Sequence, residues 1–91
     1  MDRVKILQMP AFKRAYKKLH LNQQIKVDEA IEEIRKNPKI GEEKKGDLSR
    51  VYVYKFKVHR QEMLLAYEWE EQTRTLMVLG VHENFYRDLK R

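Results

Sequence analysis

The spacing of apolar residues in the first quarter of the chain predicts a short strand followed by an amphipathic helix. Val4, Ile6 and Leu7 form a brief apolar stretch that we expect to be a strand of about six residues. Pro10 suits the first turn of a helix. Apolar residues at i, i+3, i+4 and i+7 then predict a helix over residues 10–20, and they are Phe12, Ala15, Tyr16 and Leu19.

The same spacing recurs before the next proline and predicts a second helix over residues 23–36. Its apolar positions are Val27, Ala30, Ile31 and Ile34. Asn22 is the expected N-cap. Asn37-Pro38 ends the helix because a residue before proline avoids the α region. The connection between the two helices is short, so we expect an antiparallel helical hairpin.

Both helical patterns stop at residues 38–47, where Pro38, Gly41 and Gly46 lie among charged residues and predict a loop. From Val51 the period changes to two, which predicts strands over 51–58, 63–69 and 75–81 joined by short antiparallel turns. Phe85 and Leu89 are four residues apart and predict a short closing helix.

The order β-α-α-β-β-β-α predicts an α+β fold in which the helical hairpin packs on one face of an antiparallel sheet. The 91 residues make a single domain over 1–91, since a second domain would need more chain. Apolar residues are 42% of the chain, enough to form a folded core.

Side-chain alternation divides the strand 51–58 into two faces. We expect the core face to carry Tyr52, Tyr54, Phe56 and Val58, and the open face to carry Val51, Val53, Lys55 and Lys57. The two lysines then lie roughly 7 Å apart, a spacing that suits neighbouring oxygens of a phosphodiester. The alternatives are a solubilising face or protection of a sheet edge. The aromatic residues could also stack on bases, but their shared face favours the core.

Charge is the next informative property, because 20 Lys and Arg against 14 Asp and Glu give a net charge of +6. Residues 1–20 and 44–60 each carry six basic side chains and one acid, a net charge of +5 per block. If the fold brings these blocks together, they form a cationic face for phosphate. The alternative is a solvated lysine-rich surface. Besides the strand lysines, the candidate nucleic-acid contacts are Lys44, Lys45, Arg50, Arg60 and Arg87.

Several classes of protein and site are excluded or disfavoured. The chain has no cysteine, which excludes disulfides and thiolate chemistry. It has no apolar run of about 20 residues and no apolar stretch typical of a signal peptide, so we expect a cytoplasmic protein away from the membrane. His20, His59 and His82 lack metal-ligand spacing, and no glycine-rich phosphate loop occurs. We therefore expect neither a metal nor a cofactor.

Two residues near the chain's end are candidates for proton transfer. His82 follows the third hairpin strand, and its ordinary pKa of about 6.5 allows it to exchange a proton near neutral pH. Tyr86 lies one helical turn further on, so a helix would bring it near His82. The alternatives are structural: His82 could cap the closing helix, and Tyr86 could pack that helix against the core.

Two motifs together resemble the RelE/ParE superfamily of bacterial toxins. They are Tyr-Lys-x-Lys at residues 54–57 and Gly-x-His-Glu-Asn-x-Tyr at residues 80–86. In the RelE branch the resemblance implies a metal-independent, ribosome-dependent mRNA endonuclease that inhibits translation. Its two strand lysines match Lys55 and Lys57, and its C-terminal tyrosine matches Tyr86. His82 replaces an arginine of that branch, and a second arginine, on the middle strand, is replaced in the region of Leu64.

The resemblance also implies roles and partners. Lys55 and Lys57 would stabilise phosphorane charge, His82 would act as acid or base, and Tyr86 would orient the nucleotide or assist proton transfer. The implied partners are the ribosome, mRNA and a cognate antitoxin whose acidic segment covers the basic face. Two alternatives remain: a ParE-type poison of DNA gyrase, which the missing middle-strand arginine favours, and a non-catalytic module that binds nucleic acid through charge alone.

Overall fold

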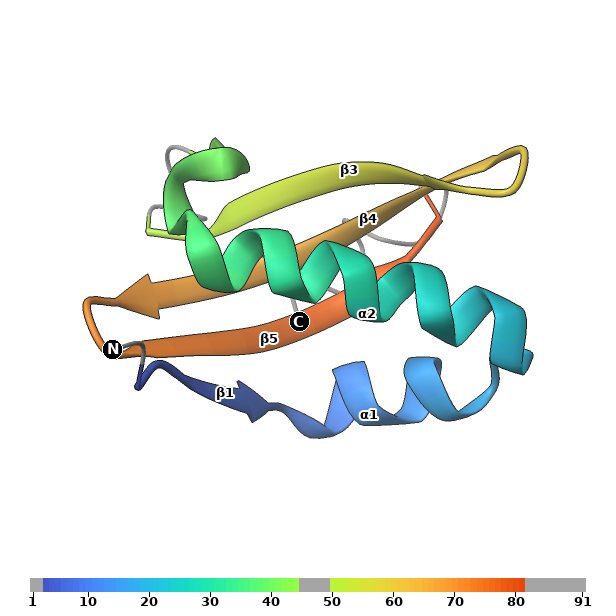
Figure 1. Ribbon diagram of the computed structural model, residues 1–91, viewed down its shortest axis with the longest axis horizontal. Helices are drawn as coiled ribbons and strands as arrows, with labels where there is room; N and C mark the ends of the chain where they lie inside the picture. Colours follow the sequence, from blue (N-terminus) through green and yellow to red (C-terminus); the bar gives the residue numbers. More distant parts are fainter. Residues whose placement is uncertain (1–2, 45–49, 82–91) are drawn as a thin grey trace.

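The computed structural model describes residues 3–44 and 50–81, and these form an α+β fold with one sheet (Figure 1). The five described strands run in the order β1-β5-β4-β3-β2. Their bounds are β1 Lys5–Gln8, β2 Glu42–Glu43, β3 Tyr52–Val58, β4 Gln61–Glu70 and β5 Thr73–Gly80. The helices are α1 Pro10–Lys17 and α2 Leu21–Lys36, with a 3-10 turn η1 at Pro38–Ile40. The predicted fold class and the order of the main elements are confirmed.

The two helices run in opposite directions, as the short connection predicts (Figure 1). α1 ends at Lys17, three residues earlier than expected, although Leu19 still packs against the core. α2 begins at Leu21, so the predicted N-cap at Asn22 is wrong. His20 is the N-cap. The side-chain oxygen of Gln23 accepts a hydrogen bond from the His20 backbone N–H at 2.8 Å, as in a capping box.

The sheet differs from the expected one at both edges. β1 pairs with β5 in parallel, so one strand pair is not antiparallel. The segment 38–47, expected to be a loop, contains η1 and the two-residue strand β2, which pairs with β3. The hairpin strands β4 and β5 also start earlier than the alternation pattern indicated. The closing helix expected around Phe85 and Leu89 lies outside the described residues.

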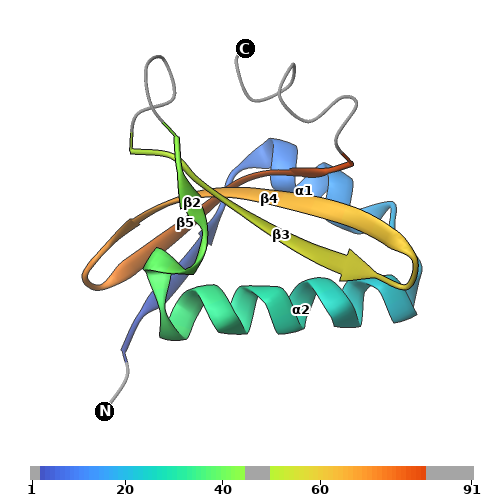
Figure 2. The same cartoon turned by 90° about the horizontal axis from the view of Figure 1, so that it is seen from above.

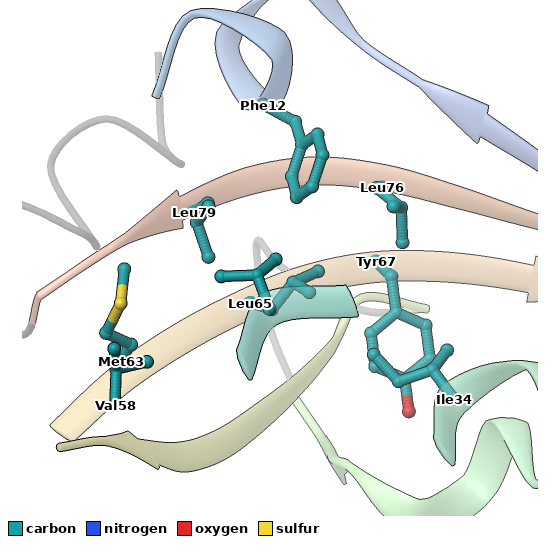
Figure 3. Packing of buried hydrophobic residues seen from close by; sticks show 9 residues of the cluster. Phe12, Ile34, Val58, Met63, Leu65, Tyr67, Leu76 and Leu79 are labelled. Atoms are coloured by element: carbon teal, nitrogen blue, oxygen red, sulfur yellow. The ribbon is translucent and has the colours of Figure 1, made fainter. Parts of the chain in front are cut away.

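The main core fills the space between the sheet and the two helices (Figure 3). Phe12 of α1 and Ile34 of α2 belong to one buried cluster with Leu65, Tyr67 and Leu76 of the sheet. In Figure 2, α2 lies along one side of the sheet. The predicted core face of β3 is confirmed, because Val58 is buried in this cluster and its three aromatic residues pack against it.

The opposite face of the sheet has a second buried cluster, although the alternation of β3 predicts an open face there. It consists of Val51, Val53, Leu64, Ala66 and Val78, with Met77 packed against it. The open face is therefore apolar in its middle, and its charged residues lie around that apolar centre.

Arg74 connects the end of α2 to the β4–β5 hairpin. Its side chain is only 4% exposed. The guanidinium donates to the carbonyl oxygens of Ile34 at 3.2 Å and Arg35 at 3.0 Å, in the last turn of α2. It also donates to Glu70 at 2.6 Å and Thr73 at 3.0 Å, which flank the hairpin turn. A cation at a helix C-terminus is favoured by the helix dipole and satisfies carbonyls that the helix leaves unpaired.

Tyr67 fixes the segment that follows α2. Its hydroxyl donates to the Pro38 carbonyl at 2.6 Å and accepts from the Gly41 N–H at 3.0 Å. A Cβ at residue 41 would lie 2.8 Å from that hydroxyl and 3.0 Å from the Val53 carbonyl, so only glycine allows this approach. The contact explains why η1 and β2 replace the expected loop.

A β-bulge interrupts the β4–β5 pairing. Tyr67 opposes Leu76, and Ala66 opposes Val78, so Met77 is the additional residue on β5. Met77 and Val78 both pack in the second cluster, whereas Leu79 returns to the main core.

We expect Arg74→Met to lower the free energy of unfolding by about 2–4 kcal/mol, because it leaves four backbone carbonyls without their donor. Urea denaturation measures this change. Lys36→Met, at the exposed end of α2, is the control and should change the free energy of unfolding by less than about 0.5 kcal/mol. An equal loss in both variants would contradict the role given to Arg74.

Tyr67→Phe should lower the free energy of unfolding by about 1–3 kcal/mol at neutral pH, because it leaves two backbone groups without their hydrogen-bond partner. Burial raises the pKa of Tyr67 from 10.0 to about 12. The folded state therefore holds the Tyr67 proton more tightly than the unfolded chain does. The resulting contribution to the free energy of unfolding is complete below pH 10 and is lost as the pH rises toward 12.

The stability difference between the native chain and Tyr67→Phe should consequently narrow above pH 10, as followed by urea denaturation at several pH values. Tyr54→Phe is the control, because the Tyr54 hydroxyl has no hydrogen bond to a described residue. A stability difference that stays constant through this pH range would contradict the raised pKa of Tyr67.

Candidate functional site

The two strand lysines lie on the face of β3 that points away from the helices. Lys55 and Lys57 are both exposed. In the register with β4, Lys55 opposes Leu64 and Lys57 opposes Glu62. Their placement on one exposed face agrees with the alternation of β3, and each can present an ammonium group to solvent.

The sheet register aligns Lys55 with the end of β5. Lys55 opposes Leu64, and Leu64 opposes Gly80 on its other side. Three strands at the usual spacing of about 4.8 Å place Lys55 and Gly80 roughly 10 Å apart in one row. The described chain continues to Val81, so it leaves the sheet in the row of Lys55.

The other members of the predicted catalytic set follow that point. His82 and Tyr86 lie outside the described residues, as do Lys45 and Arg87 of the predicted nucleic-acid contacts. Their sequence-based assignments therefore stay predictions. The structure places the lysines and the start of the final segment, and it does not place the imidazole or the phenol.

The remaining predicted nucleic-acid contacts are distributed along β3. Arg60 is exposed in the β3–β4 turn, next to His59, whose φ of 59° is in the left-handed region. Arg50 is exposed just before β3 and has a φ of 75°. Lys44 lies near that same end, where its ammonium group is 3.1 Å from a carboxylate oxygen of Glu42. The basic residues thus follow one strand from end to end.

The position of the missing middle-strand arginine is apolar. Leu64 has an exposed fraction of 0% and packs among Val53, Ala66 and Val78. A substitute cation from Arg60 would have to reach inward from the hairpin turn. The centre of this face beside Lys55 is therefore a buried apolar cluster, and none of its described members is basic.

The open face is also acidic toward the β4–β5 turn, which the sequence analysis missed. A cleft of about 620 Å³ at this end is lined by Glu43, Glu68 and Glu70 together with Arg50. The signal was present in the sequence, since alternation along 61–70 puts Glu62, Glu68 and Glu70 on the same side as Leu64. The cationic character is therefore strongest along β3 and does not extend over the whole face.

Within residues 3–44 and 50–81, no three His, Asp or Glu side chains gather in a way that could hold a metal ion. Neither of the helices in this part of the chain has the length and apolar character required to cross a bilayer.

The sequence matches a family model over residues 6–90, nearly its whole length. That family is the ParE-like toxin of type II bacterial toxin–antitoxin systems. The chain therefore belongs to this family of type II toxins. No curated protein matches the sequence.

Solved structures show the same fold at low sequence identity. A chain of the intact E. coli RelBE toxin–antitoxin complex is 17% identical with a TM-score of 0.70, and the match covers 88% of this chain and 98% of that chain. The YoeB/ParE toxin from Agrobacterium tumefaciens is 15% identical with a TM-score of 0.70, covering 87% and 99%. A chain of the Mycobacterium tuberculosis RelBE2 complex is 16% identical with a TM-score of 0.71, covering 90% and 94%.

Restoring an arginine at the middle strand should not be tolerated. Leu64→Arg should lower the free energy of unfolding by more than about 3 kcal/mol, because it places an unpaired guanidinium in an apolar cluster. Leu64→Met keeps the volume and should cost less than about 1.5 kcal/mol. Thermal and urea unfolding measure both changes. A Leu64→Arg protein as stable as the native chain would show that the site is open to solvent.

Proposed function

We propose that this toxin is a ribosome-dependent mRNA endonuclease that cleaves RNA with Lys55, Lys57, His82 and Tyr86. One observation carries the proposal: Lys55 and Gly80 share a row of the sheet, and His82 follows Gly80 by two residues. That register brings the start of the final segment toward the exposed lysines, as a composite site requires. The resemblance to the RelE branch supplies the reaction class.

RNA carries its own nucleophile, the 2′-hydroxyl. A base removes its proton, the oxygen attacks the adjacent phosphorus, and an acid protonates the leaving 5′-oxygen. Negative charge accumulates on the phosphorane oxygens in the transition state. Lys55 and Lys57 supply positive charge there, and fixed cations near developing charge lower the barrier.

Proton transfer is assigned to the final segment of the chain. His82 acts as the acid or base, since an imidazole titrates near neutral pH. Tyr86 orients the nucleotide or assists the transfer. Leu64 gives this site an apolar floor beside Lys55, where water competes less with the charged groups than on a fully polar face.

The proposed partners are the ribosome with its mRNA, and a cognate antitoxin. Two of the similar structures are chains of toxin–antitoxin complexes, which supports an antitoxin for this family member. An acidic antitoxin segment would be attracted to the line of basic residues along β3 and would compete with the phosphate groups of RNA.

A second candidate function is inhibition of DNA gyrase through protein contacts. The buried Leu64 in place of an arginine and the ParE-like description of the family both favour it. A translating extract incubated with the purified toxin, with mapping of mRNA ends, separates the two when a gyrase supercoiling assay is run in parallel. Cuts within translated codons support the nuclease, whereas loss of supercoiling with intact transcripts supports the gyrase poison.

In that extract, His82→Ala should reduce the cleavage rate by about 10²–10⁴-fold, as expected for loss of an acid–base group. Lys55→Gln should reduce it by about 10²–10³-fold, because one stabilising cation is removed from the transition state. His59→Ala and Lys26→Gln, both exposed on other elements, are the matched controls and should cleave at the native rate. Native rates in the two site variants would remove these residues from the mechanism.

A further inference from the structure

A smaller hollow lies between α2 and the outer edge of β3. Its volume is about 240 Å³, and its walls come from one side of α2 and from Tyr54, Phe56 and Lys57 of β3. β2 pairs only with Tyr52 and Val53, so no described strand borders β3 beyond Val53 on its outer side. A ligand can therefore reach across this edge from one face of the sheet to the other.

The β3 wall of this hollow is aromatic. The rings of Tyr54 and Phe56 are nearly parallel, with centroids 5.8 Å apart and planes inclined by 18°. Both side chains are half-buried, because they pack against the main core and also line the hollow. The two rings therefore present a flat apolar surface on which another planar ring can stack.

The α2 wall combines one small side chain with carboxylates. Ala30 contributes only a methyl group, which keeps the hollow open, and Glu29 and Glu33 line it one helical turn apart. The carboxylate of Glu29 is 3.7 Å from the ammonium group of Lys26. Glu33 is exposed and forms no ion pair with a described residue. Glu33 is therefore the carboxylate that can accept a hydrogen bond from a ligand in the hollow.

Lys57 connects the hollow with the proposed RNA site. It lies with Lys55 on the exposed face of β3, and its side chain also lines the hollow at the edge of the strand. A phosphate held by Lys57 would therefore lie at the rim of the hollow. The carboxylate of Glu33 repels a phosphate and attracts hydrogen-bond donors, so the interior suits a base and not the backbone of RNA.

We propose that this hollow binds one base of the substrate RNA, stacked on Tyr54 and Phe56, while Lys57 holds the adjacent phosphate. The identity of the ligand as substrate rests on the proposed function. A volume of about 240 Å³ is below the roughly 300–1,000 Å³ of pockets for drug-sized ligands, which suits a single base. Because Glu33 only accepts hydrogen bonds, bases with an exocyclic amino group are favoured over uracil.

The test uses the full chain labelled with ¹³C at its tyrosine and phenylalanine rings. The probes are 2′-O-methyl RNA tetramers of cytidine or uridine, which have equal charge and no free 2′-hydroxyl, so they bind without being cleaved. The cytidine tetramer should shift the ring signals of Tyr54 and Phe56 and bind at least about threefold more tightly than the uridine tetramer. Ring signals that do not move, or equal affinity of the two tetramers, would overturn the inference.

Two matched pairs of variants separate the hollow from general effects on binding. Tyr54→Leu should weaken the cytidine tetramer by at least about fivefold through loss of stacking, whereas Tyr52→Leu, the same change outside the hollow, should weaken it by less than about twofold. Glu33→Ala should abolish the preference for cytidine, and Glu32→Ala, the same charge change outside the hollow, should retain it. Glu33 is exposed, so this second pair decides the question if Tyr54→Leu does not fold. Equal effects within either pair would contradict base binding here.

An eight-residue peptide of alternating valine and glutamate tests whether the outer edge of β3 accepts a protein strand instead. Larger ring shifts with this peptide than with the cytidine tetramer would overturn the assignment to RNA. The binding experiment requires no cleavage. A toxin that cleaves mRNA without any response of the two rings would lose only the base site, whereas a toxin that binds the tetramer here and cleaves nothing would keep the base site and lose the proposed nuclease function.

Discussion

The joint between the helical layer and the sheet depends on a single buried guanidinium. α2 ends where its last carbonyls have no partners within the helix, and Arg74 donates to two of them while donating to two carbonyls at the β4–β5 turn. The side chain also lies over the Trp69 ring at 6.0 Å. Helix end and hairpin are thereby held in one orientation, which sets where η1, β2 and the start of β3 follow. The position of the basic residues along β3 therefore depends on the contacts of Arg74.

The period of the apolar residues was sufficient to predict most helices and strands, because each of them buries one continuous face. The i, i+3, i+4 spacing of Val27, Ala30 and Ile34 marks α2, and the alternation of Tyr52, Tyr54 and Phe56 marks the core side of β3. Alternation also placed Lys55 and Lys57 together, and the structure shows both exposed. These predictions concern neighbours in sequence, where local geometry determines the outcome.

The features that sequence reasoning missed depend on distant contacts. β2 forms because Tyr67, 26 residues after Gly41, holds the backbone there. The parallel pairing of β1 and the second cluster around Leu64 likewise depend on which strands become neighbours. Arg74 was counted as part of the positive charge, yet its environment is the end of a helix 39 residues earlier in the chain. The assignments at His82 and Tyr86 rest on motif resemblance, which does not provide geometry.

The bulge at Met77 determines which side of the sheet the last part of β5 presents. If β5 alternated regularly through this residue, Val78 would turn toward the helices and Leu79 away from them, with Gly80 reversed as well. The additional residue shifts the alternation of side chains by one position. Leu79 therefore packs in the main core, and Gly80 shares the row of Lys55. Deleting Met77 would therefore remove the bulge and keep Leu79 on the core side and Gly80 on the side of Lys55, whereas one residue inserted after Val78 would reverse the sides of both.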